Sequence, residues 1–124
     1  MKEILIFLLA LGLVAAPSFA ELKKIGTPPE GAPVKEIEVS AKKYDFTPST
    51  IEVPVDTLLK IKLQSTDREH GFAIKGVKDS CVKFKPEEPA TLEFYAGKAG
   101  EYEFECCKFC GIGHRGMKGK LLVK

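Results

Sequence analysis

Apolar and polar residues alternate in several short segments of the chain, which is the spacing of half-buried β-strands. Near the C-terminal end, for example, Tyr102 and Phe104 share one face while Glu103 and Glu105 share the other. The alternating segments are 36–41, 59–64, 90–94 and 101–105. Proline, glycine, serine and aspartate cluster between them as turn signals. No run of helical period exceeds two turns, so the pattern predicts an all-β fold, an antiparallel β-sandwich or barrel.

The first 20 residues have the composition of a secretory signal peptide. A weakly basic start is followed by an apolar run of 13 residues, Ile4 to Ala16, and then by small residues ahead of a cleavage point after Ala20. The apolar run is shorter than the ~20 residues that a membrane-spanning helix needs. An uncleaved anchor is the alternative, and the break at Pro17 disfavours it. We therefore expect a periplasmic or secreted protein without a stable membrane span in the mature chain.

The remainder of the chain is expected to form one domain. Residues 21–33 are rich in proline and glycine and predict a flexible leader, and residues 34–124 predict the folded domain. The formal net charge is only +2 and the charges are interspersed, which does not favour nucleic acid as a partner. We expect a monomer.

The residues with the strongest metal chemistry lie close together, in the spacing C-x3-C-x3-H-x2-M. They are Cys106, Cys110, His114 and Met117. Two thiolates, an imidazole and a thioether form a soft ligand set, which favours copper over hard cations. Strand parity predicts that Cys106 points inward, with Phe104, and that Cys107 points to the other side.

Two other interpretations of the same residues stay open at this stage. An exported chain sits where disulfides persist, so Cys106 and Cys110 are also candidates for a disulfide. Two cysteines and two histidines, counting His70, are equally a chemically reasonable zinc site.

The whole motif resembles that of a known copper domain. The stretch from His70-Gly71-Phe72 to the Cys106–Met117 motif is similar to the CuA domain of cytochrome c oxidase subunit II, especially of the ba3-type oxidases. The upstream segment 45–53 resembles the opening strands of the wider cupredoxin family. The resemblance covers residues 34–124 and implies a cupredoxin-like Greek-key β-sandwich or barrel.

The resemblance also implies a site with two copper ions and a set of protein ligands. These are the bridging thiolates of Cys106 and Cys110, the imidazoles of His70 and His114, the thioether of Met117 and the main-chain carbonyl of Lys108. Phe72, Phe109 and Ile112 are the candidates for excluding water. Asp67 and Glu69 are expected to be solvated loop charges rather than partners of the ligands.

Cys81 and Cys107 depart from the family pattern, in which serine or asparagine is common at the place of Cys107. Three states are open: a Cys81–Cys107 disulfide, two reduced thiols, or one thiol acting as a labile copper ligand.

The function that these features predict is electron transfer. We expect a copper electron carrier rather than an enzyme, because no open coordination position or acid/base pair is evident. Arg115, Lys118 and Lys120 flank His114 and predict a positive rim, suited to a cytochrome or oxidase partner with an acidic patch. The alternative is a copper delivery or storage module that serves the assembly of a partner oxidase.

Overall fold

The computed structural model describes residues 21–124, and the signal peptide expected over residues 1–20 lies outside them. Within the described residues the chain forms ten strands and one short 3-10 helix. The strands are β1 (Glu21–Ile25), β2 (Val34–Lys42), β3 (Asp45–Thr47), β4 (Thr50–Val53), β5 (Thr57–Ser65), β6 (His70–Ile74), β7 (Val82–Phe84), β8 (Ala90–Ala96), β9 (Gly100–Glu105) and β10 (Lys118–Val123), and the helix is η1 (His114–Gly116). The all-β fold expected from the sequence is therefore confirmed.

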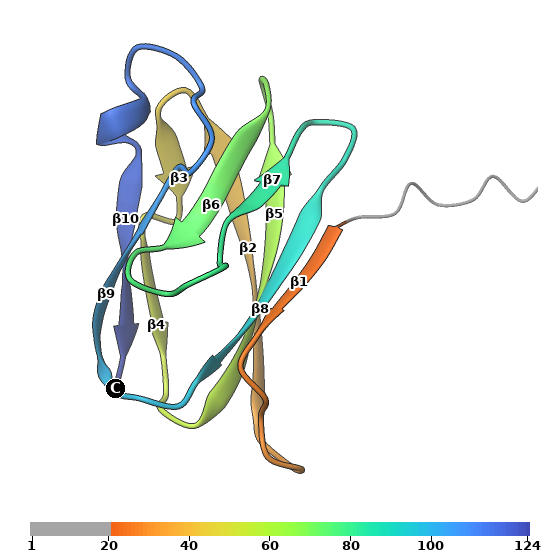
Figure 1. Cartoon of the computed structure of the whole chain (residues 1–124), viewed down its shortest axis with the longest axis vertical. Coiled ribbons are helices and arrows are strands. Elements are labelled where there is room, and N and C mark those ends of the chain that lie inside the picture. Colours follow the sequence, from red (N-terminus) through yellow and green to blue (C-terminus); the bar gives the residue numbers. More distant parts are fainter. Residues whose placement is uncertain (1–20) are drawn as a thin grey trace, which may run out of the picture.

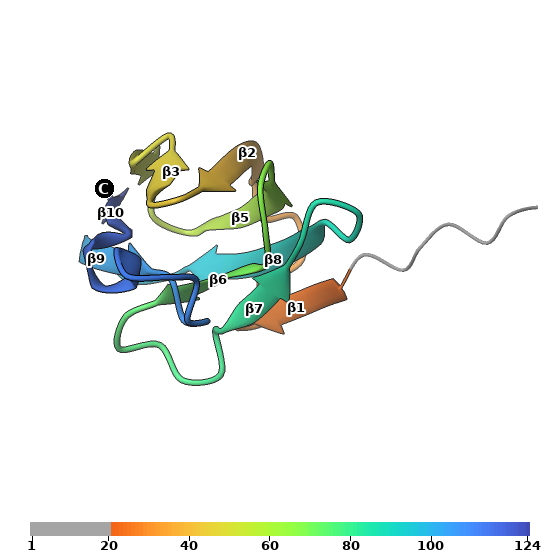
Figure 2. The ribbon, with the colours of Figure 1, turned by 90° about the horizontal axis from the view of Figure 1, so that it is seen from above.

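The strands form two sheets that pack face to face (Figures 1 and 2). One sheet has the order β1-β8-β5-β2-β3 and the other β4-β10-β9-β6-β7. Consecutive strands often lie in different sheets, which is the Greek-key arrangement implied by the resemblance. No helix in residues 21–124 is long and apolar enough to cross a membrane.

The sheets are mixed, whereas the alternation pattern led us to expect antiparallel ones. Three neighbouring pairs run parallel: β2 with β5, β4 with β10, and β1 with β8. After β2 the chain passes through β3 and β4, in the two different sheets, before it returns as β5. This crossover lets β5 run in the direction of β2. Alternation reports which face of a strand is buried and carries no information on the direction of its neighbour.

Residues 21–25 differ from the expected flexible leader, because they form the edge strand β1. Its backbone pairs with β8 from Glu21 opposite Ala90 to Ile25 opposite Phe94. The proline- and glycine-rich residues 26–33 connect this strand to β2. Residues 26–33 contain no strand or helix. Residues 21–25 are ordered because they pair with β8, which is far away in the sequence.

Three phenylalanines pack against one another in the core between the sheets. The rings of Phe72 and Phe104 stack with their centroids 4.8 Å apart, and Phe46 meets both rings edge-on at 5.6 and 5.5 Å. All three side chains are buried. Phe72 follows His70 by two residues in β6, and Phe104 precedes Cys106 by two. Because side chains alternate along a strand, burial of these rings also turns His70 and Cys106 inward.

Candidate metal centre

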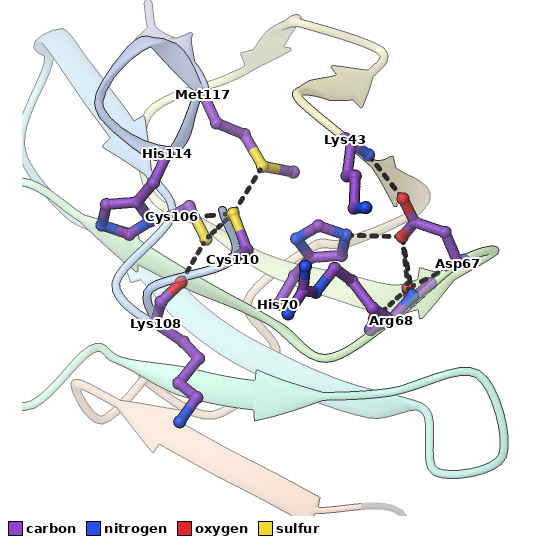
Figure 3. Close-up of polar contacts among 10 residues, drawn as sticks. Lys43, Asp67, Arg68, His70, Cys106, Lys108, Cys110, His114 and Met117 are labelled. Carbon is purple, nitrogen blue, oxygen red and sulfur yellow. Dashed lines mark hydrogen bonds and ion pairs between the residues drawn. The ribbon is translucent and has the colours of Figure 1, made fainter. Parts of the chain in front are cut away.

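The candidate ligands come together at one end of the sandwich from three parts of the chain (Figure 3). His70 opens β6, Cys106 follows the end of β9, and Met117 precedes β10. The amide of Cys106 donates a hydrogen bond to the carbonyl of Met117 at 3.0 Å. This bond extends the β9–β10 pairing by one step and closes the base of the loop that carries Cys110 and His114.

The donor atoms of the motif face one another within contact distance. The Sγ atoms of Cys106 and Cys110 are 3.5 Å apart. The Sγ of Cys106 lies 3.0 Å from the carbonyl oxygen of Lys108. The Sγ of Cys110 lies 3.7 Å from Nδ1 of His114 and 3.7 Å from Sδ of Met117. Each thiol therefore has its own neighbouring donors.

His70, at the start of β6, completes the cluster. A ring nitrogen of His70 lies within 4.8 Å of both free thiols. All six residues named from the sequence are thus brought together, and the free thiols show that Cys106 and Cys110 do not form a disulfide. His70, Cys110 and Met117 are fully buried, and Cys106 is 5% exposed.

The imidazole of His70 is held by Asp67. Its Nε2 lies 2.7 Å from Oδ1 of the Asp67 carboxylate. A carboxylate can only accept, so Nε2 carries the proton and Nδ1 keeps a free lone pair. This Nδ1 is buried and has no hydrogen-bond partner within residues 21–124. A buried polar atom without a partner is costly, and a metal ion next to the thiols would satisfy it.

Asp67 was expected to be a solvated loop charge, and this expectation was wrong. Its carboxylate accepts hydrogen bonds from the amides of Lys43 and Arg68, each at 2.7 Å, as well as from His70. Burial by itself would raise the pKa of this carboxyl. The hydrogen bonds outweigh that effect and lower the pKa from 3.8 to about 2. The signal available in the sequence was the spacing of three residues from His70, which is too common to be specific.

The Cys110 thiol is protonated in the metal-free protein at neutral pH. Burial raises the pKa of the Cys110 thiol, and the neighbouring Cys106 raises it further. Two thiolates at this separation would repel each other in a site that excludes water. A bound cation would displace the thiol protons and neutralise the two negative charges. The buried thiols therefore suit metal binding better than they suit the role of a reactive cysteine.

The other two cysteines form the Cys81–Cys107 disulfide. Of the three states left open by the sequence, the structure has the first. Cys107 points away from the buried thiols, as strand parity predicted. The bond closes a loop with a sequence separation of 26 residues, which a chain-entropy model values at about 3 kcal/mol of stability.

Tyr44 packs against the ligand loop, a contact that the sequence analysis did not predict. It lies in the turn between β2 and β3 and packs against two loop glycines. A Cβ added to Gly113 would lie 2.3 Å from the Tyr44 ring, and one added to Gly111 would lie 2.6 Å from its hydroxyl. The glycines are therefore needed because the backbone and the tyrosine ring are in direct contact. Glycine at alternate positions of the loop was visible in the sequence, but its neighbour was not.

Two of the three residues expected to exclude water do not do so. Phe72 is buried, but Phe109 is 71% exposed and Ile112 is 99% exposed. The ligand loop packs on the Tyr44 ring through Gly111 and Gly113 instead. Phe109 lies beside His114, with ring centroids 5.6 Å apart. Near His114 the surface is thus more apolar than we expected.

The expected positive rim is partly neutralised. Lys118 lies 3.8 Å from the carboxylate of Glu103, and Lys120 lies 3.2 Å from that of Glu101. Exposed ion pairs of this kind contribute little to stability, yet each one cancels a charge that a partner would meet. Arg115 is exposed and has no ion pair within residues 21–124.

Comparison with known proteins agrees with this geometry. A family model described as a cupredoxin-like domain matches residues 4–123. The chain belongs to this family. Cytochrome c oxidase subunit 2 of Thermus thermophilus is 34% identical to this cupredoxin domain over 88 residues, which is 71% of the chain and 64% of the relative. The resemblance inferred from the motif is therefore confirmed, for a chain that spans less than two thirds of that relative's length.

Solved structures show the same fold. A heme-copper terminal oxidase has a chain that superposes on this cupredoxin domain with a TM-score of 0.68 and 30% identity, covering 76% of this chain and 66% of the oxidase chain. The periplasmic domain of cytochrome oxidase subunit II from Bradyrhizobium japonicum gives a TM-score of 0.63 at 19% identity, covering 79% of this chain and 88% of that domain. At that identity the second likeness shows the fold alone.

Proposed function

We propose that this cupredoxin domain is a copper-binding electron-transfer protein with a binuclear CuA-type centre. The observation that carries the proposal is the unpartnered, buried Nδ1 of His70 beside two free, buried thiols. The likeness to a protein named cytochrome c oxidase subunit 2 and to a chain of a heme-copper terminal oxidase also supports the proposal.

The arrangement of the donors favours two copper ions over one. A mononuclear site needs one thiolate, whereas here two thiols lie 3.5 Å apart. The Lys108 carbonyl lies beside the thiol of Cys106, and His114 and Met117 lie beside that of Cys110. With His70 added, the cluster offers more donors than one copper ion accommodates. The same excess, with a thioether among the donors, disfavours a four-ligand zinc site.

A copper pair held by the thiolates of Cys106 and Cys110 would supply a one-electron acceptor and donor. The protein's own part is to hold the ligands still. Asp67 fixes the tautomer and orientation of His70, the Cys106–Met117 backbone bond fixes the base of the loop, and burial excludes water. A rigid ligand cage changes little when the charge changes, which favours rapid electron transfer. We propose a carrier or electron-transfer module rather than an enzyme, because the Asp67 carboxylate beside the cluster already accepts hydrogen bonds from His70, Lys43 and Arg68.

The proposal includes a periplasmic or secreted location and a cytochrome or oxidase as redox partner. A copper delivery or storage role is less well supported, because a delivery site should be exposed and labile. Here three of the candidate ligands are fully buried and Cys106 is 5% exposed.

Copper loading followed by metal analysis tests the proposal. The purified metal-free protein is incubated with copper, desalted, and its copper content is measured per chain, with zinc loading in parallel. We expect two copper ions per chain and a purple protein. The control is Cys110→Ser, which should hold no more than one copper ion. Preferential retention of zinc, or one copper ion in both proteins, would overturn the proposal.

A further inference from the structure

The Cys81–Cys107 disulfide lies where the backbone pairing beside the metal centre ends. The strands β6 and β9 pair only at Ala73 with Glu105 and at Ile74 with Phe104. Residues 70–72 of β6 pair with β7 on the other edge of the strand, and they have no partner in β9. The β9 side runs on past Cys106 into the ligand loop, and no ladder joins that stretch to β6. Cys107 is in this unpaired stretch, between Cys106 and Lys108.

The disulfide holds this stretch tightly against the start of β6. A Cβ added to Gly71 would lie 2.6 Å from Sγ of Cys107 and 2.8 Å from the amide nitrogen of Lys108. The cystine sulfur and the Lys108 backbone thus rest directly on the residue that follows His70. The disulfide thus holds the two segments together where backbone pairing between β6 and β9 has ended. It does so next to three of the candidate ligands: His70, Cys106 and Lys108.

The other end of the bond is anchored independently. Ser80, which precedes Cys81, is buried, and its hydroxyl accepts a hydrogen bond from the Ile74 amide at 3.0 Å and donates to the Val77 carbonyl at 2.8 Å. These bonds fix the connection between β6 and β7 without help from the disulfide. Loss of the S–S bond would therefore free the Cys106–Lys108 stretch rather than unravel the connection that carries Cys81.

We propose that the Cys81–Cys107 disulfide is a redox-sensitive clamp on the metal centre, and that its reduction by an external dithiol protein accelerates copper loss. The inference rests on the proposed copper site. In the oxidised form the clamp holds Cys106 and the Lys108 carbonyl in place against His70. In the reduced form these two ligands move with a stretch of chain that is held by the Cys106–Met117 backbone bond and by the exposed ion pair between Lys108 and Glu69 at 3.4 Å, which contributes little.

Cys81 gives a reductant access to the bond, because it is exposed at the surface. A thiolate of the external dithiol attacks Sγ of Cys81, the S–S bond breaks, and Cys107 leaves as a thiolate that takes up a proton. The second thiolate of the reductant then attacks the mixed disulfide and Cys81 leaves. Two electrons and two protons reach the pair, and the dithiol becomes a disulfide.

Copper release to a chelator tests the clamp. Copper-loaded wild-type protein and the double variant Cys81→Ser/Cys107→Ser are mixed, in the reduced state, with excess of a colorimetric copper(I) chelator, and the release rate is followed by absorbance. The double variant removes the bond without leaving an odd thiol. We expect it to take up the same amount of copper and to release it about tenfold faster or more, the scale of other contacts that support ligands. Equal release rates would overturn the proposal.

A matched variant separates the clamp from general stabilisation. Val123→Ala removes buried volume from the opposite end of β10, away from the ligand loop (Figure 1), and should lower the unfolding temperature without faster copper release. If it accelerates release as much as the double variant does, the disulfide is only a structural crosslink. Failure of wild-type protein to take up copper would instead overturn the proposed function.

A second measurement tests the access of a reductant. Copper-loaded wild-type protein is treated with reduced thioredoxin and then with an alkylating reagent, and the modified cysteines are identified by mass spectrometry. We expect modification of Cys81 and Cys107 to accompany copper release. A disulfide that stays intact under reduced thioredoxin would contradict a redox-sensitive clamp.

Discussion

The Nε2 atom of His70 donates to the Asp67 carboxylate at 2.7 Å, and this contact leaves Nδ1 of the same ring free on the side of the thiols (Figure 3). The tautomer that binds a metal through Nδ1 is therefore selected before any metal arrives. We expect Asp67→Ala to lower copper affinity about 10–100-fold, because the ring loses its orientation and tautomer. Competition with a chelator of known affinity measures this. Asp67→Asn keeps an acceptor oxygen and should recover part of the loss; equal affinity in Asp67→Ala and wild type would contradict the role.

The same carboxylate predicts a pH dependence of stability in the metal-free protein. Its folded-state pKa is lowered from 3.8 to about 2, so its contribution is present above 3.8 and is lost as the pH falls towards 2. Urea unfolding midpoints measured across this range should fall more steeply for wild type than for Asp67→Asn. Identical slopes would show that the hydrogen bonds around Asp67 do not persist in solution.

Copper binding should release protons and weaken at low pH. The pKa of the Cys110 thiol is raised by burial and by Cys106, so this thiol enters the reaction protonated. Binding of copper by its thiolate then releases about one proton or more per site. Loading in a weakly buffered solution with a pH indicator measures the release. Cys110→Ser should release fewer protons than wild type, and a site that loads without proton release would have to use other ligands.

The contact between Tyr44 and the ligand loop predicts different results at two neighbouring glycines. Gly113→Ala places a Cβ 2.3 Å from the Tyr44 ring and should cost about 1–3 kcal/mol of stability and displace His114. Gly116→Ala, in the same loop, meets nothing within 4 Å and should be neutral. Thermal unfolding and the visible spectrum of the copper form compare the two. Equal effects would mean that the loop does not rest on Tyr44.

The rim around His114 predicts unequal roles for its cations. Arg115→Glu should slow electron exchange with an acidic partner at low ionic strength, with the effect fading as salt is added. Lys118→Glu should have a smaller effect, because Glu103 already neutralises Lys118. Stopped-flow rates at several salt concentrations distinguish the two. Unchanged rates in both variants, with the copper spectrum preserved, would place docking elsewhere.

The sequence was informative where side-chain chemistry or parity determines the structure. The spacing of Cys106, Cys110, His114 and Met117 predicted a cluster, and the alternation around Phe104 predicted that Cys106 points inward. His70 was joined to them by resemblance, since nothing in the chain between residues 70 and 106 marks the two segments as neighbours.

The features that the sequence did not predict depend on packing between distant segments. The order of residues 21–25 comes from pairing with β8, and the role of Asp67 comes from a loop that turns it towards His70. Phe109 and Ile112 were expected inside because they are apolar, yet the loop that holds Cys110 and His114 inward turns these two side chains outward. Pairing of Cys81 with Cys107 was one of several open states, because spacing alone does not decide between thiols and a disulfide.

The central claim is that two copper ions share one electron between Cys106 and Cys110. Electron paramagnetic resonance of the oxidised, fully loaded protein tests this most directly, because the hyperfine pattern reports how many copper nuclei the unpaired electron meets. The account predicts a pattern spread over two equivalent copper nuclei, at two copper ions per chain. The pattern of a single copper nucleus in a fully loaded sample would contradict it.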